Sequence, residues 1–169
     1  PIEQPLKDAS QINQLFDKIT YCKGASVLYM LHEYVGPETF KVAIQDYMSS
    51  YAYSNATTED LWGCLSAASG KEVETVMTAW IREVGFPCVN VHHSFRGDKF
   101  FLEFSQERFS HPNNDKTLWS IPIKGHYINK DDLMEEFEVL LDREYIDLEL
   151  PDFDICNPKA WILLNPRKT

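Results

Sequence analysis

Three features are scarce or missing in this sequence, and they limit the classes of protein to which it can belong. No apolar run approaches the roughly 20 residues that span a bilayer. Basic residues are scarce, with 16 Lys and Arg against 26 Asp and Glu and a net charge of −10. Phosphate loops, dinucleotide-binding glycine motifs and G-x-S-x-G are absent as well. We therefore expect no membrane span and no nucleic-acid or anionic-membrane partner, because phosphate groups attract basic surfaces.

Cysteine is also sparse. The chain has four cysteines, which form no C-x-x-C pair and are too few for a disulfide scaffold: Cys22, Cys64, Cys88 and Cys156. We interpret them as reduced thiols that behave as small apolar residues. Reduced thiols favour a reducing compartment, so we expect a cytoplasmic protein, while a secretory or membrane-anchored parent stays open as an alternative.

The sequence contains only the beginning of a zinc-protease motif. A metalloprotease helix needs H-E-x-x-H, because two histidines four residues apart share one helical face and one zinc ion. His32-Glu33 starts this pattern, but the position four residues after His32 is Gly36. The five histidines and four cysteines of the chain form no metal-binding pattern, so we expect no metal to be bound by this chain.

The first half of the chain has helical periodicity. Apolar residues make up 44% of the sequence, which excludes a disordered chain. Glycines end several of the periodic segments, and Pro37 opens one of them. Thr57 or Thr58 caps another, with Glu59 and Asp60 in its first turn. About five short helices are predicted, over residues 12–19, 27–35, 37–51, 57–70 and 71–84.

After Phe86-Pro87 the apolar period falls to two, which is typical of strands. Pro122 lies within one predicted strand and indicates a sheet edge or a bulge. The fold class predicted is a helical bundle over residues 1–86 followed by an antiparallel β-sandwich over residues 87–169. Strands are predicted over residues 88–92, 100–104, 119–123, 137–141, 146–150 and 161–163.

One run of residues resembles a known enzyme family. Phe16-Asp17-Lys18-Ile19-Thr20-Tyr21-Cys22-Lys23-Gly24-Ala25 is similar to the pattern F-D-x-I-S-Y-x-K-G-A of the gluzincin zinc aminopeptidases, specifically the puromycin-sensitive type. Further matches follow in the same order as in the family. They are Asn55-Ala56-Thr57-Thr58-Glu59-Asp60-Leu61-Trp62, Gly85-Phe86-Pro87, Trp119-Ser120-Ile121-Pro122 and Trp161-Ile162-Leu163-Leu164-Asn165.

The resemblance implies a function and two site residues. The family removes N-terminal residues from peptides with Zn²⁺, and the tyrosine of its motif donates a hydrogen bond to the oxyanion of the tetrahedral intermediate. Tyr21 matches that tyrosine. Phe16 matches a phenylalanine that lines the pocket for the first side chain of the substrate, although an apolar helical stripe explains Phe16 equally well. Thr20 stands where the family usually has serine.

The resemblance also implies what this chain would be within the enzyme. The helices correspond to the C-terminal part of a thermolysin-like catalytic domain, and the zinc motif of the family lies upstream of them. We therefore expect an internal fragment that binds no Zn²⁺ and is inactive alone. The expected partners are peptide substrates and the rest of the parent polypeptide. An exposed apolar face would also favour self-association.

Two other interpretations stay open at this point. The chain could be a non-catalytic binding or scaffold module derived from this family, or part of a catalytically dead homologue. Zinc ligands encoded directly upstream of Pro1 would favour the enzyme over both.

Overall fold

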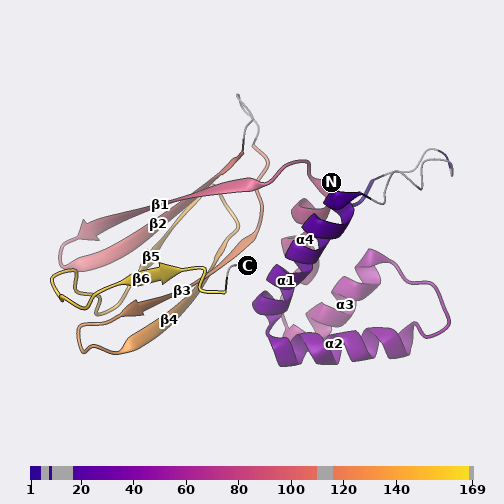
Figure 1. Cartoon of the computed structure of the whole chain (residues 1–169), viewed down its shortest axis with the longest axis horizontal. Coiled ribbons are helices and arrows are strands. Elements are labelled where there is room, and N and C mark those ends of the chain that lie inside the picture. Colours follow the sequence, from indigo (N-terminus) through magenta and orange to yellow (C-terminus); the bar gives the residue numbers. More distant parts are fainter. Residues whose placement is uncertain (5–7, 9–16, 110–115, 168–169) are drawn as a thin grey trace. The chain divides into compact units, whose positions relative to one another are not determined.

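The chain divides into two compact units, and each is described separately. The computed structural model describes residues 1–4, 8, 17–109 and 116–167, without the side chain of Ile19. One unit comprises Pro1–Val84 and contains the helices. The other begins at Gly85 and contains the strands (Figure 1). The predicted order of helices followed by antiparallel strands is confirmed.

The helical unit begins with an unusual element. A five-residue π-helix, η2 (Ile19–Lys23), leads directly into α1 (Gly24–Val35). Three α-helices follow: α2 (Pro37–Ser50), α3 (Thr58–Ser69) and α4 (Val73–Arg82). In this unit α1 packs against α2, α2 against α3, and α3 against α4.

The helix ends follow from local sequence chemistry. Gly36 has φ of +92°, a conformation that a side chain would strain, and it separates α1 from α2. At the start of α3, the Thr57 hydroxyl accepts a hydrogen bond from the Asp60 amide, and the Asp60 carboxylate accepts one from the Thr57 amide. This reciprocal capping satisfies two amides that have no partner within the helix, and it lowers the pKa of Asp60. Of the two predicted caps, Thr57 is the one used.

The core of the helical unit comes mainly from α1, α3 and α4. From α2 only Ala43 is fully buried, and Met48, which lies on the apolar stripe of that helix, is exposed. The buried apolar residues are Val27, Met30, Leu31, Val35, Ala43, Trp62, Leu65, Val73, Val76, Met77 and Ile81.

The β unit consists of two three-stranded antiparallel sheets. One has the order β1-β2-β5, and the other has the order β4-β3-β6. Every pairing is antiparallel. The strands are β1 (Pro87–Arg96), β2 (Lys99–Arg108), β3 (Ile121–Ile128), β4 (Met134–Leu141), β5 (Tyr145–Glu149) and β6 (Ile162–Leu164).

Strand β2 shows most clearly how the sequence pattern sets burial. Phe100, Leu102, Phe104 and Gln106 are buried, and the residues between them are not. Successive side chains of a strand point to opposite faces, so the alternation places three apolar groups and one amide in the core. The burial of Phe100, Leu102 and Phe104 agrees with the alternation read from the sequence.

The amide of Gln106 joins the two sheets. Its nitrogen donates to the carbonyl oxygens of Trp119 (2.8 Å), Arg143 (2.9 Å) and Leu141 (3.3 Å). Its oxygen accepts from the Trp119 amide at 2.9 Å. Buried backbone groups without partners are costly, and this one side chain supplies partners at Trp119, before β3, and at the end of β4.

Pro122 shows why a proline is tolerated in β3. Although β3 is the central strand of its sheet, β6 pairs with it only over Gly125–Tyr127. Pro122 pairs with Leu140 of β4 alone. On its other side, Pro122 faces no strand that would need its missing amide. At this position β3 is therefore an edge of the sheet, as predicted.

The structure tests the first predicted helix only at its end. The helix predicted over residues 12–19 falls largely outside the described residues. Its last residue, Ile19, opens η2 rather than closing an α-helix.

In the described parts of the chain, no helix combines the length and hydropathy needed to cross a membrane.

We predict that Gln106→Met destabilises the β unit by about 1–3 kcal/mol, because methionine matches the length of glutamine but leaves buried backbone groups unpaired. Urea unfolding of the chain, followed by protection of the β2 amides from hydrogen exchange, measures the change. Glu107→Met is the matched control, since Glu107 is the exposed neighbour on the same strand, and it should change stability by less than about 0.5 kcal/mol. Equal effects of the two substitutions would contradict the role of Gln106.

Candidate functional site

Tyr21 lies in the middle of η2 and is open to solvent. Its side chain is 62% exposed. Its backbone amide bonds the carbonyl of Asp17 at 3.2 Å, and its own carbonyl accepts from the Gly24 amide. Helical segments with π geometry are rare and occur frequently at functional sites. Because Tyr21 is largely exposed, its phenol is a polar group at the surface and not a packed core group.

Tyr21 borders an apolar hollow of about 670 Å³ within the helical unit. We call it the Tyr21 hollow. Its walls come from the N-terminal residues, η2, α1, α3 and α4, and most of its surface is apolar. A mostly apolar concavity with a few polar groups at its edge is the usual form of a ligand site. The residues that line it are Ile2, Glu3, Thr20, Tyr21, Gly24, Ala25, Val27, Leu28, Thr58, Trp62 and Ile81.

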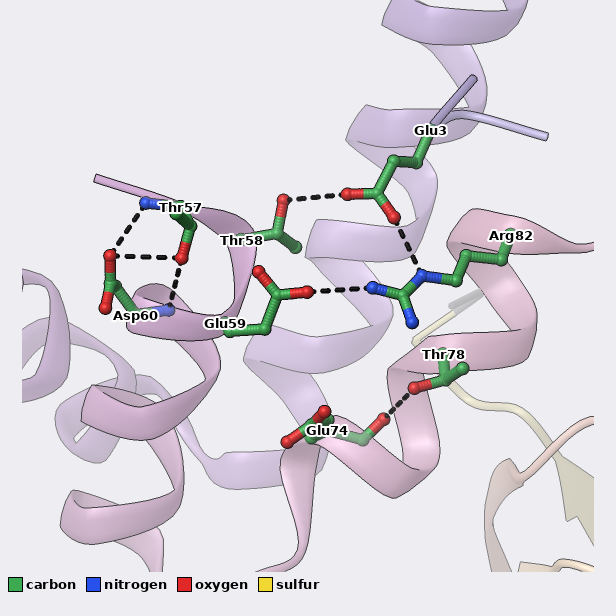
Figure 2. Close-up of polar contacts among 8 residues, drawn as sticks. All are labelled: Glu3, Thr57, Thr58, Glu59, Asp60, Glu74, Thr78 and Arg82. Atoms are coloured by element: carbon green, nitrogen blue, oxygen red, sulfur yellow. Dashed lines mark hydrogen bonds and ion pairs between the residues drawn. The ribbon is translucent and has the colours of Figure 1, made fainter. Parts of the chain in front are cut away.

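Glu3 and Thr58, which line the hollow, belong to a polar network. Figure 2 shows its contacts. The Arg82 guanidinium donates to Glu3 and to Glu59, both at 2.8 Å. Glu3 also accepts a hydrogen bond from the Thr58 hydroxyl at 3.4 Å. Hydrogen bonding to Glu3 raises the pKa of Arg82. Ion pairs that are this exposed stabilise a fold little, and this network links the N-terminal residues, α3 and α4 at the surface.

Two further residues were considered for a site from the sequence, Phe16 and His32. Phe16 lies outside the described residues. His32, which begins the incomplete zinc motif, packs against Phe40 with ring centroids 5.2 Å apart and against Tyr29 at 6.2 Å. Its Nδ1 lies 3.2 Å from a carboxylate oxygen of Glu33.

The histidines, cysteines and carboxylates of the described residues are dispersed. Three or more closely grouped His, Cys, Asp or Glu side chains would be needed, and residues 1–4, 8, 17–109 and 116–167 contain no such group. His32 and Glu33 form a pair without a third ligand in that set. The described residues therefore do not fit a zinc ion.

Sequence comparison relates the chain to aminopeptidases. Residues 1–80 match the family described as Peptidase family M1 domain. Aminopeptidase 2, mitochondrial, of Saccharomyces cerevisiae is 43% identical over 126 residues, which is 72% of this chain and 13% of the yeast protein. Aminopeptidase M1-D of Oryza sativa subsp. japonica is 38% identical over 176 aligned residues, covering 100% of this chain and 19% of the rice protein.

Structural comparison gives the same fold. The structure of aminopeptidase A of Legionella pneumophila in complex with aspartic acid has a TM-score of 0.70 with this chain at 20% sequence identity. The match covers 89% of this chain and 17% of the Legionella chain. The chain therefore spans a fifth or less of the length of each of these relatives, and its homologues are M1-family aminopeptidases.

Sequence reasoning missed most of the hollow. From the sequence, Trp62 belongs to a family match, Ile81 only to the helix predicted over residues 71–84, and Glu3 to no predicted site. Glu3 and Arg82 are 79 positions apart, and no local pattern indicates that they pair. The signal that was available, the match around Tyr21, located the polar group but not the apolar surface beside it.

We predict that Gly24→Ala stabilises the helical unit by about 0.4–1 kcal/mol, because Gly24 has helical backbone angles and a Cβ added there meets nothing within 4 Å. Gly36→Ala is the contrasting variant and should destabilise by about 1–3 kcal/mol, since its φ is +92°. Thermal unfolding of both variants measures the two signs. A destabilising Gly24→Ala would show that the hollow is closed at this position.

Proposed function

We propose that this chain is a segment of a zinc aminopeptidase of the puromycin-sensitive type, which hydrolyses residues from the N-termini of peptides. In this proposal the helical unit is the C-terminal part of the catalytic domain, and the β unit is the β-sandwich domain that follows it. The match of residues 1–80 to the M1 family and the aminopeptidase fold of the chain support the proposal. Tyr21 and Phe16 are the residues of this segment to which we assign a role in the reaction, and the remaining reacting groups are assigned to the parent protein.

Tyr21 is the proposed catalytic residue of this segment. Its phenol donates a hydrogen bond to the oxyanion that forms when water attacks the peptide carbonyl. The observation that carries this assignment is the exposure of the ring at the edge of the Tyr21 hollow. A donor placed where negative charge develops is worth roughly 3–4 kcal/mol in a site from which water is excluded.

Phe16 is the proposed wall of the pocket for the first substrate side chain. It precedes Tyr21 by five residues, as the pocket phenylalanine does in the family pattern.

Zinc and its ligands are proposed to belong to the parent protein outside this chain. When bound, the ion would activate water and polarise the substrate carbonyl. The sequence has no complete H-E-x-x-H, which supports this division. We therefore propose that the isolated chain hydrolyses no peptide, and that peptide substrates bind only to the parent.

The test of the catalytic assignment is Tyr21→Phe in the full-length parent. We expect kcat to fall by about 100- to 1,000-fold with little change in KM, because the lost hydrogen bond exists only in the transition state. Tyr29→Phe is the matched control, since Tyr29 is an exposed tyrosine of α1 that does not line the hollow, and its kcat should stay unchanged. An unchanged kcat in Tyr21→Phe would refute the assignment.

The isolated chain is also proposed to self-associate through the helical unit. Tyr21 and Leu28, both at the Tyr21 hollow, are 62% and 43% exposed, and apolar patches of this kind favour association. In the parent, the same surface would contact the rest of the polypeptide. Light scattering over a concentration series should show a rising average mass, whereas a constant monomer mass would contradict this proposal.

A further inference from the structure

Two charged side chains bind the two ends of η2. At its start, the Asp17 carboxylate accepts a hydrogen bond from the Thr20 amide at 2.8 Å. The carbonyl of the same residue accepts from the Tyr21 amide at 3.2 Å. The first amides of a helical segment have no partner within it, and an aspartate three residues earlier is the preferred type of group to supply one.

At the other end, Lys23 connects η2 to α4. Its Nζ donates to the carbonyl oxygen of Glu83 at 3.3 Å. Glu83 is the residue that follows α4, and its amide makes a hydrogen bond to the Ala79 carbonyl at the end of that helix. A lysine at this place gives the Glu83 carbonyl a donor and complements the negative end of the helix dipole. Partial burial lowers the pKa of Lys23, which is the expected consequence of an ammonium held against protein rather than extended into water.

We propose that Asp17 and Lys23 are positioning residues, which hold η2 so that the Tyr21 phenol faces the hollow. This inference rests on the proposed function of Tyr21. The hydroxyl stands at the far end of its side chain, so a small rotation of the backbone at Tyr21 moves the hydroxyl further than the backbone itself. A segment with π geometry has α-helical alternatives that would turn the side chain to another direction, and the two contacts oppose that change.

The size of the effect follows from geometry. A misplacement of about 1 Å at a reacting group costs about 100-fold in rate. Lys23→Met keeps the apolar stem and removes the donor, so kcat of the parent should fall by about 10- to 100-fold with KM changed by less than about twofold. Lys23→Arg, which restores a donor, should recover most of the loss.

Lys41→Met is the matched control, because it makes the same substitution on the exposed side of α2. Its kcat and unfolding temperature should equal those of the unchanged parent. Asp17→Ala should behave like Lys23→Met, and Asp17→Asn, which keeps an oxygen acceptor, should lose less.

A double-mutant cycle separates positioning from a general structural role. In a Tyr21→Phe background, Lys23→Met should lower kcat by about twofold or less, because a residue that acts only through the phenol has nothing left to position. Equal losses in both backgrounds would overturn the proposal.

Hydrogen exchange distinguishes failure of this inference from failure of the proposed function. In both Lys23→Met and Asp17→Ala, amides of residues 19–24 should exchange faster while those of α3 keep their rates. Faster exchange with unchanged kcat in Tyr21→Phe would refute the catalytic role and leave the restraint of η2 intact. Unchanged exchange would refute the restraint itself.

Discussion

Helix α4 ends with carbonyl oxygens that no residue of that helix can reach, and separate parts of the helical unit supply their donors. The amides of Ile2 and Glu3 both bond the carbonyl of Ile81, at 2.8 and 3.0 Å. Lys23 bonds the carbonyl of Glu83. Between them, the Arg82 side chain joins Glu3 to Glu59 of α3. The end of α4 is thus the point at which the N-terminal residues, η2 and α3 are fixed, and the Tyr21 hollow is bordered by these same elements.

The two units supply hydrogen-bond partners to their backbone polar groups in different ways. The β unit uses a fully buried amide, Gln106, whose partners are all backbone groups of the same unit. The helical unit uses exposed or half-buried charges at the end of α4, which leave an apolar concavity open. A closed core with satisfied polar groups suits a structural domain. An open apolar surface with one phenol at its edge suits a site that is completed by something else, which is the arrangement we propose for the parent enzyme.

Sequence periodicity predicted β2 well because burial alternates along that strand, as Phe100, Leu102 and Phe104 show. Pro122 could be placed at a local edge because its missing amide allows little else. The π geometry of Ile19–Lys23 was not predictable, because apolar spacing reports which face is buried and not which carbonyl each amide reaches. Tyr21 was found from a motif, whereas Glu3, Trp62 and Ile81 join the site only through the tertiary fold. Phe16 stays a prediction, since it lies outside the described residues.

The most direct test of the central claim is a crystal structure of the full-length parent with a transition-state analogue that carries a tetrahedral centre. The account predicts that the Tyr21 hydroxyl lies about 2.7–3.1 Å from the analogue oxygen that mimics the oxyanion, with the ring at the edge of the hollow. A structure in which the analogue is bound and the Tyr21 hydroxyl contacts no part of it would contradict the account.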